Sequence, residues 1–213
     1  MALGFIMNAK SGLGATPICS ISYCVAYVTG LSFPDMTMIL FVICFFTGVI
    51  FIGKKPHWTD FLQLPYCFVF TRCMSAFSAL LPSPENLAVK IIFQALGIIC
   101  VGCGASLTLN MHIIPNPGDF MVNAIAYRTR KPLGITKNIV DISIVAMAAI
   151  VALIFQKNVF QAGVGIGTIA AMFLVGRVIA LVSHFFSDKL RAIYKNAPIG
   201  WLDNRAETIE VAK

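Results

Sequence analysis

Long apolar stretches separated by short polar segments run along most of this chain. A helix that crosses a membrane needs about 20 mostly apolar residues. Stretches of roughly that length with almost no charge occur at residues 36–53, 63–82, 86–111, 138–155 and 160–187. The pattern therefore predicts an all-α polytopic membrane protein.

Two further apolar stretches, residues 9–32 and 112–129, contain glycine and proline near their starts. From the proline onward, each offers only about 13 to 16 residues for a helix, which is short for a membrane span. Such a length is typical of a re-entrant half-helix that begins inside the membrane. We expect one re-entrant half-helix in each of these stretches.

The chain also carries a weak internal repeat. An offset of one hundred residues aligns Gly4 with Gly104, Pro17 with Pro117, Tyr27 with Tyr127, Thr29 with Thr129 and Ile39 with Ile139. We therefore predict a first membrane repeat at residues 1–85, a second at 86–187 and a cytoplasmic tail at 188–213. The first repeat should open with a helix equivalent to 86–111, so most of that helix is expected to be missing or encoded upstream of Met1.

Composition excludes a soluble domain, because 58% of the residues are hydrophobic, only 12% are charged and the mean hydropathy is +0.85. The net charge of +7 comes from short basic clusters between apolar stretches, which is typical of a membrane protein and not of a nucleic-acid partner. If Lys54 and Lys55 are cytoplasmic and 112–129 is re-entrant, eleven of the sixteen basic residues, Lys137 among them, lie inside. Lys157 then lies outside, and Lys90 lies near the outer end of its helix. Each repeat then has three spans, and because three is odd the repeats are inverted, as in many secondary transporters.

Two matched sequences are candidates for a binding site. Thr16-Pro17 and Asn116-Pro117 each read as a helix start, with the first residue as N-cap and proline at the first helical position. Gly118 and Asp119 follow in the second. If both helices begin inside the membrane, their free N–H groups and positive dipole ends favour an anionic group between them. The alternative is that glycine and proline only break two tilted helices.

Arg72 and Arg177 are further candidates, since both lie in the middle of apolar stretches and align when about five residues are inserted in the second repeat. An ionisable residue inside a membrane is costly and often functional. The alternative is a structural pair with a buried acid, for which Asp119 and Asp141 are available. We include Asp141 among the candidate site residues.

The sequence favours neither an enzyme nor a cofactor. It contains no nucleophile with a neighbouring base and no paired metal ligands such as H-E-x-x-H. Cys100 and Cys103 have the spacing of a redox or metal-binding pair, but they lie in an uncharged run with no companion pair or histidine. The glycines in the stretch 163–168 lack the preceding strand and following acidic residue of a dinucleotide site. We expect these glycines to let backbones approach closely.

Several motifs together resemble one group of bacterial proteins. They are KSGLGATP at 10–17, LQLP at 62–65, PGD at 117–119, TRKPLG at 129–134 with Asp141, and GVGIGT at 163–168. This order resembles the YczE-like and YitT-like membrane proteins, which implies a multi-pass protein of the bacterial inner membrane. That group has no well-established activity. The chain differs from it at the N-terminus and at Arg130, where the group more often has glycine.

The leading hypothesis is a secondary transporter of a small anionic or zwitterionic solute, which is held between the two half-helix starts with Arg72 and Arg177 nearby. The alternatives are a membrane scaffold or accessory protein that assists a partner enzyme, and a channel for a small solute. The expected partners are the lipid bilayer, the solute and, as a possibility, further copies of the chain.

Overall fold

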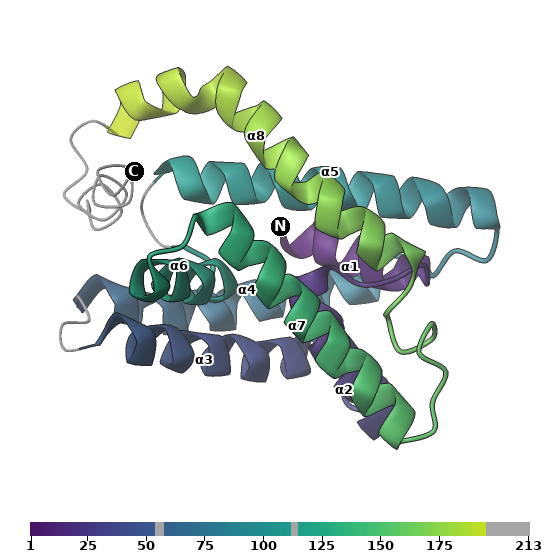
Figure 1. Ribbon diagram of the computed structural model, residues 1–213. Helices are drawn as coiled ribbons and strands as arrows, with labels where there is room; N and C mark the ends of the chain where they lie inside the picture. The colour runs from purple at the N-terminus through teal and green to yellow at the C-terminus, as the bar shows by residue number, and fades with distance from the viewer. Residues whose placement is uncertain (54–57, 112–114, 195–213) are drawn as a thin grey trace.

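The computed structural model describes residues 1–53, 58–111 and 115–194 as a set of helices (Figure 1). No strand occurs in these three ranges. The helices are α1 (Ala2–Ser11), η1 (Pro17–Cys19) continuing as α2 (Ser20–Thr29), α3 (Phe33–Ile52), η2 (Trp58–Leu62) continuing as α4 (Gln63–Leu80), α5 (Leu87–Met111), α6 (Pro117–Thr129), α7 (Leu133–Ile154) and α8 (Ile166–Tyr194). The predicted all-α class is confirmed.

Four of the helices are long and apolar enough to cross a membrane, at Phe33–Ile52, Leu87–Thr108, Leu133–Ile154 and Ile166–Phe185. Their length and composition indicate a membrane protein. The expected span at 63–82 forms α4, which is not among the four, because Gln63 and Arg72 reduce its apolar character. Lys54 and Lys55 and residues 195–213 of the expected tail lie outside the described residues.

Three helix boundaries differ from the prediction for identifiable reasons. Helix α3 begins at Phe33, three residues early, because the Ser32 hydroxyl accepts a bond from the Asp35 N–H at 3.3 Å and caps the helix. Helix α7 begins at Leu133, because Pro132 stands at its N-cap. Helix α8 begins at Ile166 and not at 160, because Gly163 has a φ of +88° that an α-helix does not allow.

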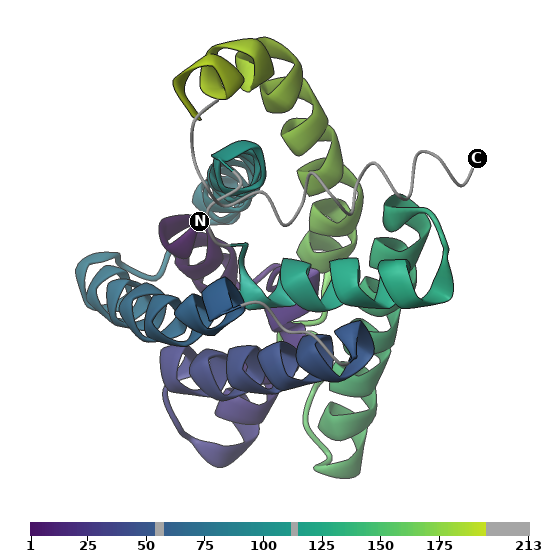
Figure 2. The same ribbon diagram turned by 90° about the vertical axis from the view of Figure 1, so that its left-hand side faces the viewer.

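Some helices pack on a partner from the other half of the sequence, and others on a partner from the same half (Figure 2). Helix α1 packs on α5 and α4, α5 packs on α8, α3 packs on α6, and α2 packs on α7. Glycines allow α1 and α5 to cross closely: a Cβ atom at Gly4 would lie 2.6 Å from the Gly97 carbonyl oxygen. Beside this crossing, Phe5 packs edge to face on Phe70 at 5.6 Å between ring centroids.

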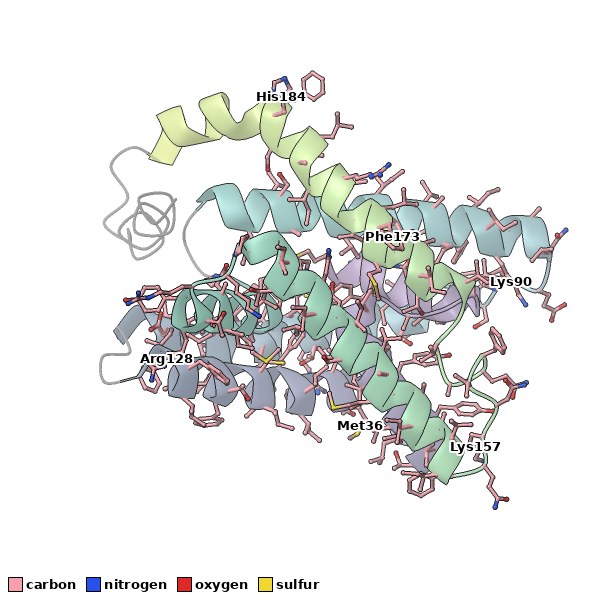
Figure 3. All side chains as sticks on the ribbon, viewed as in Figure 1. Met36, Lys90, Arg128, Lys157, Phe173 and His184 are labelled. Atoms are coloured by element: carbon pink, nitrogen blue, oxygen red, sulfur yellow. The ribbon has the colours of Figure 1, made fainter. Side chains whose placement is uncertain are left out.

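The two short helices run toward opposite ends of the molecule (Figure 3). Lys90 and Lys157 lie at one end and Arg128, in the last turn of α6, lies at the other. The last turn of α2 lies at the Lys157 end, because the Tyr27 hydroxyl donates to Gln161 at 2.9 Å and the Lys157 ammonium lies 6.0 Å from the centroid of the Tyr27 ring. The structure thus places Arg128 at the opposite end of the molecule from Lys90 and Lys157. Which end faces the cytoplasm stays a prediction.

Both short helices end on a residue in the left-handed region of backbone conformation. Gly30 has a φ of 75° after α2, whereas Arg130 has a φ of 54° after α6. A side chain in this region costs roughly 1–2 kcal/mol, and glycine avoids that cost while losing some backbone entropy. Arg130 therefore forms a strained C-cap.

We expect Arg130→Gly to raise the free energy of unfolding by about 0.5–1 kcal/mol, because it relieves this strain. Arg128→Gly removes the same charge from inside α6 and should instead cost about 1 kcal/mol. Thermal unfolding in detergent measures both. Equal shifts for the two variants would show that charge and not backbone conformation decides the effect.

Candidate functional site

The starts of the two short helices meet. A Cβ atom at Gly118 would lie 2.5 Å from Cδ1 of Ile18, so the first turn of α6 packs directly on η1. Thr16 and Asn116 both have the extended backbone of an N-cap, with ψ values of 143° and 136°. Asn116 accepts a bond from the Gly118 N–H at 3.4 Å, whereas Thr16 makes no side-chain cap bond. The predicted N-cap positions are confirmed, and only Asn116 caps with its side chain.

A cavity lies at this meeting point. Its polar wall consists of Thr16, Asn116, Asp119, Lys137 and Asp141, and its apolar wall of Met1, Phe5, Pro17, Ile18, Val101, Ala105, Ala171, Met172, Val175, Gly176 and Ile179. About 40 Å³ of it is open to the centre of a water molecule. By this measure one water takes about 10–15 Å³, so the cavity has room for roughly three waters.

Lys137 joins the two acids of this cavity. Its ammonium lies 3.5 Å from Asp119 Oδ1 and 3.8 Å from Asp141 Oδ2. Asp141 follows Lys137 by one turn on α7, and the packing of α6 on α7 brings Asp119 to them. The side chain of Asp141 is only 6% exposed. We call Asp119, Lys137 and Asp141 the charged triad.

Two polar atoms of the cavity wall lack partners among the residues that the structure describes. They are Asp141 Oδ1 and Thr16 Oγ1, both buried. A buried polar atom without a hydrogen bond costs about 1–3 kcal/mol. Both atoms lie where a ligand or water could bind them, so the site offers unused hydrogen-bonding capacity to an occupant.

The structure brings together most of the residues that the sequence singles out. Thr16, Pro17, Asn116, Asp119 and Asp141 line the cavity. Pro117 is buried at the first position of α6, and Gly118 forms the contact with Ile18.

The two arginines lie elsewhere. Arg72 donates to Asp35 at 2.6 Å, and both side chains are 48% exposed. The expected partner of a structural Arg72 was Asp119 or Asp141, and the correct one is Asp35, because α4 packs on α3. Arg177 is exposed on α8 and does not line the cavity, although its neighbour Gly176 does. The expectation that both arginines lie near the half-helix starts is therefore corrected.

Lys137 is the site residue that sequence reasoning missed, since it was counted with the cytoplasmic basic cluster. A signal was present: Lys137 precedes Asp141 by four residues within one apolar helix, which places both on the same face. No group of three or more metal-binding side chains occurs in the described part of the chain. The cluster thus offers two carboxylates and one ammonium.

The glycines of 163–168 hold a loop against the start of α8. The Gly167 N–H donates to the Leu13 carbonyl and the Ala15 N–H donates to the Gly163 carbonyl, both at 2.9 Å. A Cβ atom at Gly165 would lie only 2.2 Å from the Leu13 oxygen. The predicted close backbone approach is confirmed, with the loop at 13–15 as the partner.

A second, larger hollow of about 420 Å³ lies on the other side of this loop. Ala15 lines it, whereas the next residue, Thr16, lines the central cavity. Its other walls include Tyr23, Tyr27, Lys90 and Gln161. We call it the vestibule, and it lies at the Lys90 end of the molecule (Figure 3).

Residues 1–184 match the model of a family of unknown function, DUF6198, and the chain belongs to that family. No curated protein and no solved structure matches the chain. The geometry of the cavity is therefore the main guide to function.

We expect Lys137→Met to lower the free energy of unfolding by about 2–3 kcal/mol, because it leaves two carboxylates near each other without their shared cation. Adding Asp141→Asn should restore at least half of the loss, since it removes one of the two negative charges. Lys131→Met, at an exposed position just before α7, serves as control and should change stability by less than about 0.5 kcal/mol. Strictly additive losses in the double variant would show that Lys137 and Asp141 do not interact.

Proposed function

We propose that this protein is a secondary transporter of the bacterial inner membrane that moves a small anionic or zwitterionic solute. Its two halves are inverted repeats, each with a re-entrant half-helix, and the solute binds in the central cavity. The inner-membrane assignment rests on the resemblance to YczE-like and YitT-like proteins.

Helix order and direction support the inverted repeat. Each half has a first helix, a short helix of 13 residues from a proline to a threonine, and two longer helices. The packing is reciprocal, since α2 of the first half lies on α7 and α6 of the second lies on α3. The short helices end at opposite ends of the molecule and their starts meet, which is the relation that two inverted half-helices have.

The observation that carries the proposal is the charged triad at the meeting point of the two helix starts. Three ionisable side chains in the interior of a membrane protein are costly, and in such places they mark binding sites and ion pathways. A scaffold would gain nothing from a polar cavity with unpaired buried atoms. Inverted-repeat transporters bind their solutes at such interrupted helices.

The arrangement offers positive groups to a solute that carries negative charge. The starts of η1 and α6 present positive dipole ends to the cavity, and the Lys137 ammonium adds a full positive charge. Asp119 and Asp141 offer partners for the ammonium group of a zwitterion. Lys137 thus takes the role that Arg72 and Arg177 have in the sequence hypothesis.

Transport by reconstituted vesicles tests the proposal. A panel of small anions and zwitterions, among them formate, acetate and glycine, should contain at least one solute that is taken up. Thr16→Val, which keeps the shape and removes the hydroxyl, should slow its uptake at least tenfold, because the hydroxyl faces the solute. Arg177 lies outside the cavity, so the Arg177→Gln variant should take up the solute at the same rate as the parent protein. Absence of uptake for every solute would favour the scaffold.

Cysteine labelling tests the orientation. In a background without the seven native cysteines, single cysteines at positions 84 and 158 should react with an impermeant maleimide added outside intact cells. A cysteine at position 130 should react only after permeabilisation, since the end that carries Arg128 is expected to face the cytoplasm. External labelling at 130 together with 84 would exclude the inverted arrangement.

A further inference from the structure

The charge of the central cavity bears on what must accompany an anion. Two carboxylates and one ammonium give the charged triad a net charge of −1. The two helix starts offset this with roughly half a positive charge each. The empty site is thus close to neutral, and a bound anion would add a negative charge that nothing compensates.

The other ionisable side chains near the triad are weak acids and do not supply that charge. The α-amino group of Met1, a residue that also lines the cavity, is a base, but its burial disfavours the charged form. Tyr66 of α4 lies within electrostatic reach of Asp119, and Cys19 of η1 lies within reach of Asp141 and of Cys44 on α3. None of these side chains carries a positive charge in any protonation state. The remaining way to offset an anion is to protonate one carboxylate of the triad.

Asp141 is the better placed of the two carboxylates. Its side chain is 6% exposed, against 20% for Asp119, and its ammonium contact is longer, 3.8 Å against 3.5 Å. Asp141 Oδ1 is buried and without a partner among the described residues. A proton on that oxygen turns an unused acceptor into a donor toward the cavity.

Three donors then converge on one small space. They are the protonated Asp141 carboxyl, the Thr16 hydroxyl, whose oxygen is also unpartnered, and the Lys137 ammonium, which a neutral Asp141 no longer holds. Together they match the two oxygens of a carboxylate. The space admits roughly three waters, which corresponds to an anion of about three heavy atoms, the size of formate.

We propose that the site takes up one proton, on Asp141, with each small monovalent anion that it binds, so that the protein is a proton–anion symporter for formate-sized anions. This inference rests on the transporter function proposed above. The proton is bound to the Asp141 carboxylate when the anion enters, and both leave together on the other side of the membrane. The vestibule, with Lys90 in its wall, offers the anion a positively charged approach.

Calorimetric titration of the purified protein with formate tests the coupling. The titrations use two chloride-free buffers at the same pH with different enthalpies of ionisation, and the difference in heat counts the protons taken up. The expected count is close to one per formate. Asp141→Asn, a neutral mimic of the protonated acid, should still bind formate. The number of protons taken up per formate should be near zero, and the affinity for formate should no longer fall with rising pH.

Asp119→Asn is the matched variant. It removes the other carboxylate of the triad and one negative charge, so the proton count should fall below one. It should stay above the count in Asp141→Asn, because Asp141 can still take up a proton. A count that disappears in Asp119→Asn and persists in Asp141→Asn would assign the proton to the wrong carboxylate and overturn the proposal. Loss of formate binding in a folded Asp141→Asn protein, judged by its unfolding temperature, would overturn it too.

Failure of this inference and failure of the transporter function give different results. Formate binding without proton uptake, or uptake by vesicles of a zwitterion but not of formate, would overturn the symport proposal and leave the transporter in place. Absence of transport for every solute of the panel would remove both. In vesicles, an inward proton gradient should speed formate uptake by the parent protein. The rate of formate uptake by the Asp141→Asn variant should not change with the gradient.

Discussion

The unpaired backbone N–H groups at the starts of the two short helices are the constraint on which the rest of the structure depends. A helix start leaves up to four N–H groups without partners in the helix, and the interior of a membrane protein offers no bulk water to satisfy them. Asn116 takes up one of these groups, that of Gly118. The two starts therefore need a polar space and neighbouring charge, and Asp119 in the first turn of α6 supplies a negative charge where the helix dipole favours it.

Holding a helix start in this position requires the preceding loop to be fixed. In the first half, the glycines of 163–168 provide that support by pairing backbone to backbone with residues 13–15. Gln94 on α5 closes the arrangement, since its amide nitrogen donates to the Gly167 carbonyl at 3.0 Å and its oxygen accepts from the Ser11 hydroxyl at 2.7 Å. Gly14, Ala15 and Gly163 of the same pairing also line the vestibule, whereas the next residue, Thr16, lines the central cavity.

Local sequence signals predicted the parts of the fold that local physics decides. The apolar run that became α5 and the proline that begins α6 were predicted correctly, because helix length and helix starts depend on neighbouring residues. The partner of Arg72 was not, since Asp35 reaches it only through the packing of α4 on α3. Lys137 was missed for a similar reason: a basic residue near the end of a helix reads as an interfacial charge until the packing of α6 shows which acid it faces.

The charged residues that line the central cavity all come from the second half of the sequence. At an offset of one hundred residues, Asn116 corresponds to Thr16, whereas Asp119, Lys137 and Asp141 correspond to Cys19, Thr37 and Phe41. Those three residues are fully buried and uncharged, and Phe41 packs in the apolar cluster with Phe70. A repeat with charges in both halves would place two acidic pairs in one small cavity, at a large cost in desolvation and repulsion. Both halves of the sequence form a helix start, but only the second half supplies charged side chains. The cavity therefore has two opposed helix starts and a single charged triad between them.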